Sequence, residues 1–515
     1  MTGDSTGSGA ASKPSRPSPF APGWFHLLAG CMFVALVWLG ARARVYIDQV
    51  WLTEWGRRLL EPATDHSMFM LVDGTTLPPP AWLGPLLAEC LFRMSGDLIA
   101  FRSIAAAAAI AMAYGVLRLA LRAGAPMSLA ALAAAALLLD PTIVQSVVVG
   151  RADTLSIAVL VAGLLLASRG FDDASPGIRG PVLVAAGYSL AVLSPAIWSA
   201  ALLLGPLALL HWVQAWGRAR RAGWGQPARI TVFALIPGLL LALTVGWPMW
   251  QAHAAAAPHA VDLTRSYGEG FADALFAGVQ MLAVSLPLLI LGVAGACMLP
   301  ARRLGLWLLA GMLLVLCSGF YPFRIPYLQA WATAALILAA ASVAAPRATV
   351  LSRLGALLAA IGVVLMLVRV LLAGGNQPPP GTQPWVTTLP PGTRVADFGW
   401  DFYVAARNRG LPIMRAFPGI PDASVAAWLR TAQPDIVLRP ALPQNAWIMV
   451  DDADSAFSMG NYCQMGYLDW TGQPVSPDAR VRQPPTPLGW RLGMTRDHGP
   501  YVWWVPCDRV PASVP

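Results

Sequence analysis

The stretch WFHLLAGCMFVALVWLGA, residues 24–41, decides the fold class of this chain. It contains no Asp, Glu, Lys or Arg, and a helix of this length spans roughly 27 Å, close to the thickness of a bilayer core. A helix satisfies its own backbone hydrogen bonds, so it is the expected form of such a segment in lipid. We therefore predict that residues 24–41 form a first membrane span.

The same apolar pattern recurs through the first three quarters of the chain. Hydrophobic residues make up 57% of the 515 residues and charged residues only 12%, about half the charged fraction of a soluble domain. The sequence predicts an all-α polytopic membrane protein with about eleven transmembrane helices. The later spans are expected at about 103–121, 127–147, 152–168, 181–194, 196–214, 230–249, 274–298, 304–320, 328–345 and 354–373. The pair around Ser194-Pro195 could instead be one kinked helix.

The remaining segments differ in composition from the spans. Residues 1–20 are rich in Ser, Gly and Pro and predict a disordered tail. Within the membrane domain, residues 21–373, a long first loop at 42–102 contains a short apolar stretch at 82–94. We expect that stretch to form a helix lying along the membrane interface.

A linker and a small α/β domain follow the last span. Residues 374–390 are rich in Pro, Gly and Thr and predict the linker, and residues 391–515 predict the domain. Short strands are expected at 395–400, 436–438 and 447–450, and helices at 401–409 and 422–431.

Arginines in the short loops indicate the orientation. With a cytoplasmic N-terminus, the inner loops hold Arg118, Arg122, Arg169, Arg179, Arg218, Arg220, Arg221, Arg229, Arg302, Arg303, Arg347 and Arg353. The short outer loops hold only Arg151, Arg265 and Arg324. Positive residues favour the cytoplasmic side, although Arg42, Arg44, Arg57 and Arg58 then lie outside. We expect a multi-pass protein of a bacterial inner membrane with a periplasmic C-terminal domain.

The cysteines indicate a disulfide rather than a metal site. Cys463 and Cys507 are the two cysteines of the domain placed in an oxidising compartment, where disulfides persist. We predict that they are bonded; the alternative is two separate buried thiols. The six cysteines show no metal-ligand spacing. We assign no cofactor, and no pattern supports a divalent metal ion.

Two acids near the outer ends of spans are candidates for chemistry. Asp48 follows the first span and could act as a base on a substrate at the membrane surface, or be a solvated interface acid. Asp153 lies in GRADT, residues 150–154, at the start of a span. Charged residues at membrane depth are often functional, but Asp153 could instead be a helix N-cap. By contrast, Asp140-Pro141 favours a structural break with Pro at the first helical position.

Arg324 lies in an outer turn full of aromatic residues and prolines, GFYPFRIPY at 319–327. A guanidinium group grips phosphate with two parallel hydrogen bonds. A phosphate contact is therefore one interpretation of Arg324, and an interface arginine that extends toward water is the other.

The order of these features resembles a known family. Asp48 comes first, then the Pro-Pro run and interfacial helix with Arg102, then Arg151-Ala152-Asp153, and finally Arg324-Ile325-Pro326-Tyr327. Together they resemble the GT-C superfamily of membrane glycosyltransferases over about residues 20–345. Within it they are most similar to the protein O-mannosyltransferase, aminoarabinose transferase and rhizobial lipopolysaccharide transferase branch.

This resemblance implies a sugar donor linked to polyprenyl phosphate and an outward-facing site. Asp48 would be the catalytic base, and Arg324 would hold the donor phosphate. Asp153, Arg151, Tyr327 and Arg102 would bind substrate. The acceptor would be a hydroxyl of a cell-envelope glycan, lipid or protein, and nucleic acid is not expected. Two positions depart from the family: Gln49 follows Asp48 where a second acid is common, and Ser194 precedes Pro195 where relatives often carry lysine.

Two other classes of protein remain as alternatives. A transporter needs polar or broken helices near the membrane midplane, whereas these spans are mostly Ala, Leu and Val, with their acids at the outer ends. A non-catalytic scaffold or sensor with a periplasmic binding domain is compatible with the sequence.

Overall fold

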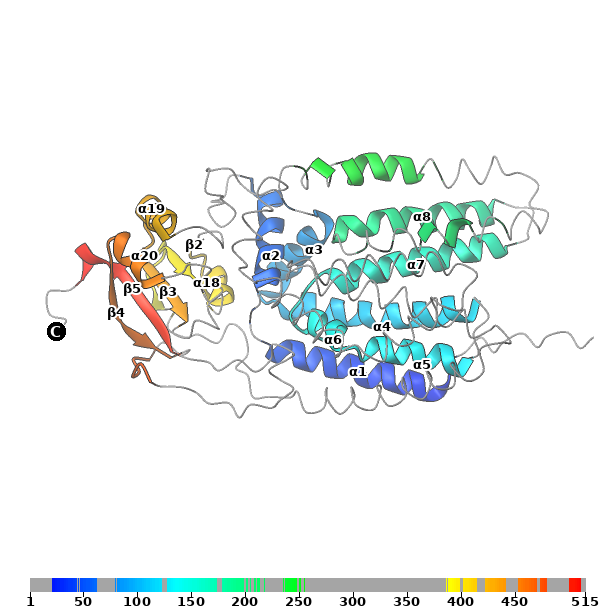
Figure 1. The fold of residues 1–515 in the computed structure, drawn as a ribbon, viewed down its shortest axis with the longest axis horizontal. Helices are drawn as coiled ribbons and strands as arrows, with labels where there is room; N and C mark the ends of the chain where they lie inside the picture. Colours follow the sequence, from blue (N-terminus) through cyan, green and yellow to red (C-terminus); the bar gives the residue numbers. More distant parts are fainter. Residues whose placement is uncertain are drawn as a thin grey trace, which may run out of the picture.

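The computed structural model combines a helical N-terminal part with a C-terminal sheet (Figure 1). It describes residues 21–198, except 44, 46, 63–78, 80, 123–126 and 174–177. It also describes scattered positions between 201 and 254, and residues 386–510 except 387, 399–401, 415–421, 441–452, 470–472 and 479–499. The tail at 1–20, most of the linker at 374–390 and the spans expected beyond residue 254 lie outside these ranges.

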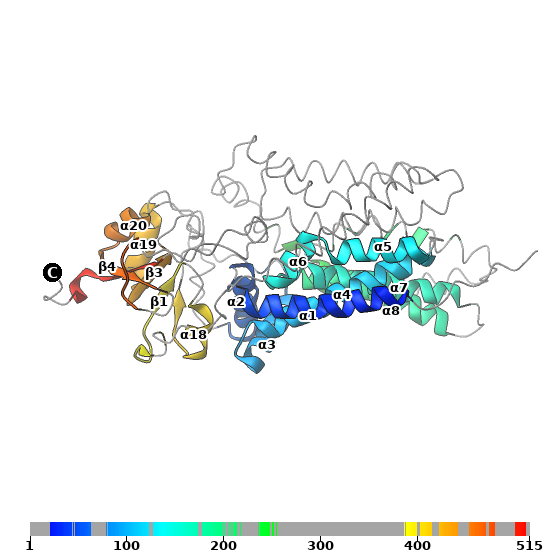
Figure 2. The ribbon, with the colours of Figure 1, turned by 90° about the horizontal axis from the view of Figure 1, so that it is seen from below.

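The N-terminal part is a bundle of helices that run side by side (Figures 1 and 2). Its helices are α1 (Gly23–Arg42), α4 (Ile99–Arg122), α5 (Met127–Leu138), α6 (Pro141–Val148), α7 (Asp153–Asp172) and α8 (Arg179–Ile197). Among the described residues, α1, α4, α7 and α8 are long and apolar enough to cross a membrane. These four predicted helices are confirmed, and their length and composition agree with the expected polytopic membrane class.

Helices α7 and α8 approach each other closely through glycine. A Cβ atom on Gly163 would lie 2.5 Å from the carbonyl oxygen of Gly187, and one on Gly170 would lie 2.5 Å from that of Gly180. In lipid the hydrophobic effect does not drive apolar helices together. Their contacts are stabilised instead by small residues that allow close backbone packing. Glycine therefore sets the spacing of this helix pair.

The predicted break at Asp140-Pro141 is confirmed. Helix α5 ends at Leu138, and α6 begins at Pro141. Proline fits the first helical position because the missing N–H would have had no partner within the helix. The stretch expected as one span at 127–147 is thus two shorter helices.

At Ser194-Pro195 the helix continues instead of breaking. Pro195 has no N–H to donate to the carbonyl oxygen of Ala191, and the Ser194 hydroxyl donates to that oxygen at 2.7 Å instead. Helix α8 ends two residues later at Ile197, and Trp198 is extended. Ser194 therefore has a local structural role at the position where lysine was expected from the resemblance.

Two helices of the first loop lie at the end of this bundle. Helix α3 (Leu83–Ser95) confirms the helix expected at 82–94, and Gly96 ends it in a left-handed conformation. Helix α2 (Ile47–Leu60) crosses the end of the bundle (Figure 1) and was not predicted. Asp48 therefore lies in the first turn of a helix rather than in a loop.

The C-terminal part is a five-stranded mixed sheet. Its strands are β1 (Val395–Asp397), β2 (Ile413–Met414), β3 (Ile436–Pro440), β4 (Tyr462–Leu468) and β5 (Tyr501–Pro506), in the order β2-β1-β3-β5-β4. Strands β1, β2 and β3 are parallel, and β5 is antiparallel to β3 and β4. The helices are α18 (Tyr403–Asn408), α19 (Asp422–Ala432) and α20 (Ala453–Met459). The strand expected at 447–450 lies outside the described residues.

The disulfide prediction is confirmed. Cys463 at the start of β4 is bonded to Cys507 just after β5, with Cα atoms 5.0 Å apart.

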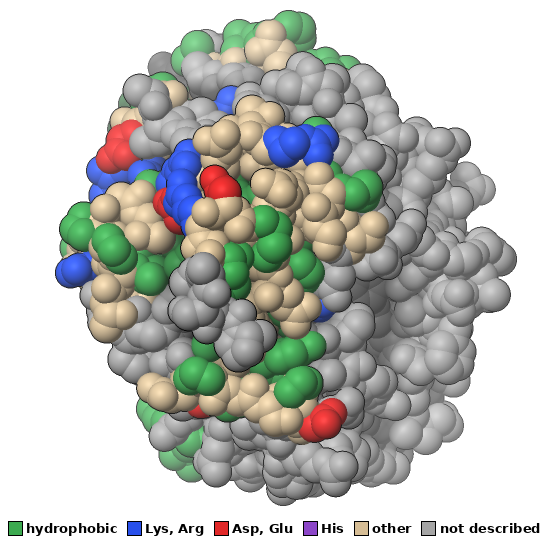
Figure 3. Space-filling view, turned by 90° about the vertical axis from the view of Figure 1, so that its left-hand side faces the viewer, with side chains coloured by type: hydrophobic (Ala, Val, Ile, Leu, Met, Phe, Trp, Pro, Cys, Tyr) green, Lys and Arg blue, Asp and Glu red, His purple; other side chains and the backbone are tan. Residues whose placement is uncertain are grey.

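The surface of the molecule at the end with the C-terminal sheet mixes basic, acidic and apolar side chains (Figure 3). Within the domain, Arg394 and Arg509 both pair with Asp435.

Candidate active site

Asp48 on α2 meets Arg151 in the turn between α6 and α7. Figure 1 shows α2 at the end of the bundle nearest the C-terminal sheet. The Asp48 carboxylate accepts a hydrogen bond from Nη1 of Arg151, a residue 103 positions away. The Asp48 side chain is 23% exposed and that of Arg151 is 7% exposed. The carboxylate is therefore mostly buried but partly accessible, and the arginine that holds it is buried.

The backbone at the end of α6 places Arg151. Gly150 has a positive φ of 74°. Its N–H donates to the carbonyl of Val147 at 3.1 Å, and the Arg151 N–H donates to the carbonyl of Ser146 at 2.9 Å. This pair of bonds is the Schellman ending of a helix, in which glycine adopts the left-handed conformation. The short turn between α6 and α7 thus directs Arg151 toward α2.

Asp153 holds the other side of the same guanidinium. Its Oδ2 accepts a hydrogen bond from Nε of Arg151 at 2.6 Å, and its side chain is fully buried. Its Oδ1 has no hydrogen-bond partner among the described residues. The N-cap interpretation of Asp153 was wrong, because the N-cap of α7 is Ala152 and Asp153 is the first helical residue.

Gln49 follows Asp48 on α2 and bonds residues at the start of α4. Its Oε1 accepts a hydrogen bond from Nε of Arg102, and its Nε2 donates to the carbonyl of Leu98; both distances are 2.9 Å. A Cβ atom on Gly150 would lie 2.6 Å from Oε1 of Gln49. The buried amide therefore contacts both the start of α4 and the turn that carries Arg151.

Arg102 is 1% exposed and donates to oxygen atoms of the chain itself. Nη1 bonds the carbonyl oxygens of Gly40 and Ala43 at 2.7 Å each, where α1 ends. The carbonyl groups at a helix C-terminus have no partner within the helix, so a cation there stabilises them. The structure thus places Arg102 beside the candidate site as a support for α1 and α2.

Burial raises the pKa of the Asp48 carboxyl above its usual value; Arg151 lowers it, and Asp153 raises it further. Four arginines are near Asp48 in sequence: Arg42, Arg44, Arg57 and Arg58. Arg57 instead pairs with Glu54 and Glu61, and the side chains of Arg42 and Arg44 are not among those described. A raised pKa suits a general base, which works best when its pKa approaches the working pH.

Two further site residues were predicted from the sequence. Arg324 and Tyr327 lie outside the described residues. Within the described ranges, no cluster of three or more His, Cys, Asp or Glu side chains could hold a metal ion, and we assign none.

Sequence reasoning missed Gln49 and Gly150 as parts of the site. Gly150 directly precedes a charged residue between two apolar blocks, which is a usable signal for a tight turn. Gln49 gave no comparable signal, because its partners at Leu98 and Arg102 are distant in sequence.

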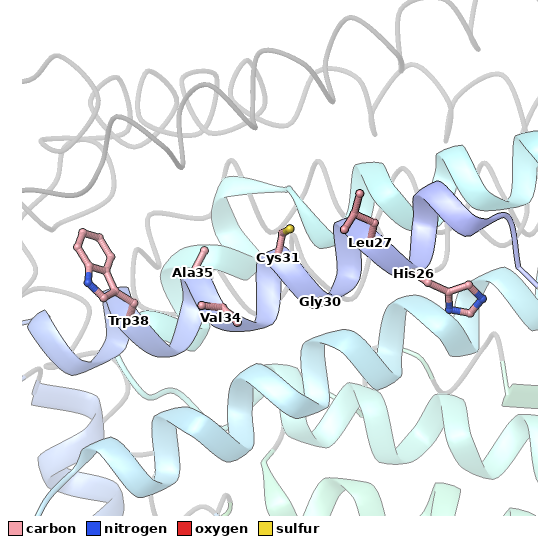
Figure 4. A pocket seen from close by; sticks show the side chains of 7 residues that line it. All are labelled: His26, Leu27, Gly30, Cys31, Val34, Ala35 and Trp38. Carbon is pink, nitrogen blue, oxygen red and sulfur yellow. The ribbon is translucent and has the colours of Figure 1, made fainter.

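A hollow on α1 is separate from these residues. It has a volume of about 590 Å³ and is lined by His26, Leu27, Gly30, Cys31, Val34, Ala35 and Trp38. Figure 4 shows these residues along α1. The lining is almost wholly apolar, so it suits hydrocarbon better than a charged or sugar-bearing group.

Comparison with solved structures shows which fold this is. No protein-family model matches the chain, and no curated protein matches it in sequence. The fold matches ArnT from Cupriavidus metallidurans, crystallised bound to undecaprenyl phosphate, with a TM-score of 0.52 and 15% identity. That match covers 96% of this chain and 99% of the ArnT chain.

A second match is the arabinofuranosyltransferase AftD from mycobacteria, solved by cryo-electron microscopy, with a TM-score of 0.52 and 14% identity. It covers 95% of this chain but 40% of AftD, so the chain spans less than half of that protein. Identities this low show the fold alone. The chain shares the fold of ArnT and AftD, and this agrees with the fold that the resemblance in sequence implied.

Proposed function

We propose that this chain is a membrane glycosyltransferase. It moves a sugar from a polyprenyl-phosphate-linked donor to a hydroxyl of a cell-envelope glycan, lipid or protein on the periplasmic face. The observation that carries the proposal is the pairing of Asp48 with Arg151 and Asp153 at one end of a GT-C fold. The bound undecaprenyl phosphate of ArnT supports a lipid-phosphate donor.

In the proposed reaction, Asp48 accepts the proton of the acceptor hydroxyl. The acceptor oxygen then forms a bond to the anomeric carbon of the donor sugar, and the bond from that carbon to the phosphate oxygen breaks. The lipid phosphate leaves with the electron pair. Phosphate is already a good leaving group, so the main needs are a positioned base and cations that stabilise the developing charge.

The residues around Asp48 have distinct parts in this proposal. Arg151 orients the Asp48 carboxylate, and Asp153 holds Arg151. Arg324 and Tyr327 remain the proposed contacts of the donor phosphate. We assign Arg102 a positioning role in place of direct substrate contact, because its guanidinium bonds Gly40, Ala43 and Gln49.

The first test of the proposed function identifies the sugar donor. Membrane lipids from a strain that lacks the chain are compared with those of the parent, and we expect one lipid-linked sugar to accumulate. The purified protein is then assayed for transfer from that lipid. If no lipid-linked sugar accumulates and the protein does not bind undecaprenyl phosphate, the scaffold or sensor alternative is favoured.

The residue test uses Asp48→Asn, which keeps the shape of the side chain and removes the base. We expect transfer to fall about 10²- to 10⁴-fold, with an unchanged size-exclusion profile. Glu61→Gln is the matched control. Glu61 follows α2, is 44% exposed and makes surface ion pairs of a kind that contribute little. Near-normal transfer by Asp48→Asn would exclude Asp48 as the base and make Asp153 the next candidate.

A further inference from the structure

A buried ion pair joins the C-terminal domain to the helix that carries Asp48. Arg407 of α18 bonds the carboxylate of Glu54 on α2, and its Nη2 donates to both oxygens of Glu89 on α3, at 2.9 and 3.0 Å. The side chains of Arg407 and Glu54 are 10% and 11% exposed, and that of Glu89 is fully buried. Figures 1 and 2 show α18 on the side of the sheet that faces α2 and α3.

Hydrogen bonds and rings surround this ion pair. The Tyr403 hydroxyl donates to Glu54 at 2.8 Å, and burial together with Glu54 raises the pKa of Tyr403, so it remains a donor. The Arg407 guanidinium lies 4.9 Å from the centre of the Phe92 ring. At the end of α3, Nδ2 of Asn408 donates to the carbonyl of Gly96 at 2.7 Å.

Apolar side chains extend the same contact. Val45, Val50, Trp55 and Phe92 of the first loop share one buried cluster with residues of the C-terminal domain, including Phe398, Tyr403, Val404 and Trp428. The first loop and the C-terminal domain therefore share one core, rather than being joined only by a linker.

We infer that Arg407 is a positioning residue for Asp48, and that the C-terminal domain thereby forms part of the catalytic machinery. This inference rests on the proposed function. Glu54 lies six residues after Asp48 on the same helix, about 9 Å along its axis. A contact that fixes Glu54 therefore fixes α2, and α2 determines where the Asp48 carboxylate lies relative to Arg151.

Removing Arg407 would leave its two acidic partners with unequal remaining contacts. Two buried acids, Glu54 and Glu89, face three arginines, Arg57, Arg93 and Arg407. Glu89 keeps Arg93 at 2.7 Å if Arg407 is removed. Glu54 keeps Arg57 at only 3.7 Å, with the Tyr403 hydroxyl. Loss of Arg407 should therefore disturb α2 more than α3.

The experiment uses the full chain in lipid nanodiscs. Arg407→Ala, Arg407→Lys and the control Arg409→Ala are compared by hydrogen exchange and by transfer kinetics. Arg409 is two residues away at the end of α18 and is exposed. We expect Arg407→Ala to speed exchange in α2 at least about tenfold, with α7 unchanged. We expect kcat to fall about 10- to 100-fold, as a misplacement of about 1 Å can cause.

The conservative variant separates positioning from simple stability. Lysine keeps the charge but lacks the planar fork that bonds two carboxylates, so Arg407→Lys should be intermediate in both measurements, while Arg409→Ala matches the wild type. Unchanged exchange in α2, or faster exchange with unchanged kcat, would overturn the inference. If Arg407→Ala does not fold, Glu54→Gln is measured in the same two ways.

The two proposals can fail separately. If the wild type transfers no sugar from any lipid-linked donor, the proposed function fails, and the catalytic part of this inference fails with it. The exchange measurement still decides whether Arg407 holds α2. If Asp48→Asn abolishes transfer but Arg407→Ala transfers normally, the proposed function stands and this inference is wrong.

Discussion

Oε1 of Gln49 accepts a hydrogen bond from Nε of Arg102 at 2.9 Å, although the two residues are 53 positions apart. The same amide donates to the carbonyl of Leu98. A carboxylate could accept the first bond but could not donate the second. A glutamine next to Asp48 is thus suited to its local partners, and a second acid here would place an acceptor against an acceptor.

Replacing Gln49 with Leu should destabilise the protein and slow transfer. The change keeps much of the volume but leaves buried polar atoms of Leu98 and Arg102 without this partner, a cost of about 1–3 kcal/mol. The measurement is denaturation in detergent together with the transfer assay. Thr53→Val, one turn along α2, is the control, since its hydroxyl donates to a backbone carbonyl of the same helix, that of Gln49. Equal stability of Gln49→Leu and wild type would contradict the assigned role.

Replacing Gly150 with Ala should lower stability and transfer more than the addition of one methyl group usually does. The positive φ costs a non-glycine residue about 1–2 kcal/mol, and the new methyl group would lie 2.6 Å from Oε1 of Gln49. We expect lower stability and weaker transfer, because the turn also carries Arg151. Gly30→Ala on α1, where a Cβ meets nothing within 4 Å, should be neutral or slightly stabilising. Similar results for both variants would show that the turn tolerates a side chain.

The pH dependence of transfer should report the charges around Asp48. Because its pKa is raised above the ordinary 3.8, the rate should fall as the pH drops through that raised value and Asp48 becomes protonated. Arg151→Met removes an influence that lowers the pKa, so the acidic limb should move to higher pH. Asp153→Asn removes an influence that raises it, so the limb should move to lower pH. Shifts in the opposite directions in the measured pH–rate profiles would exclude Asp48 as the titrating base.

Removing the disulfide should loosen the edge of the sheet. Cys463 and Cys507 are 44 residues apart, and a closed loop of that size stabilises by about 4 kcal/mol in the loop-entropy model. We expect the double variant Cys463→Ser/Cys507→Ser to show faster hydrogen exchange in β4 and β5, while Cys90→Ser, at a free exposed cysteine, does not. Two free thiols in mass mapping of protein from the native membrane would contradict the bond.

The orientation can be tested with reporter fusions. A reporter that is active only outside the cytoplasm should give signal when fused after Gly375 and none when fused near Arg220, because loop arginines favour the cytoplasmic side. The opposite pattern would place Asp48 and the C-terminal domain on the cytoplasmic face and exclude a periplasmic reaction.

The sequence predicted the elements whose stabilisation is local. Apolar blocks located α1, α4 and α7 to within a few residues, because lipid requires long runs of apolar side chains. Asp140-Pro141 located the break before α6. Helix α2 has no such apolar pattern, because its sequence IDQVWLTEWGRRLL mixes aromatic and charged residues. Its acids pair with Arg151 and Arg407, which are far away in the chain.

The candidate site was predicted only in part, because its contacts also join residues that are far apart in the sequence. Asp48 and Asp153 were identified as candidates by their positions at span ends, and Arg151 by the resemblance to the family. Nothing local indicated that one arginine bonds both acids. Strand β5 was missed because a short continuous apolar run cannot be distinguished from buried helix by periodicity alone.

The contact between Glu54 and Arg407 also sets an order of events during biosynthesis. The two residues are 353 positions apart, so at 5–20 residues per second a ribosome adds Arg407 about 20–70 s after Glu54. During that interval α2 is already made, but the arginine that holds it has yet to be synthesised. A nascent chain stalled or truncated before residue 407 would thus contain Asp48, Arg151 and Asp153 with α2 unanchored, and the candidate site would be complete only when the C-terminal domain docks.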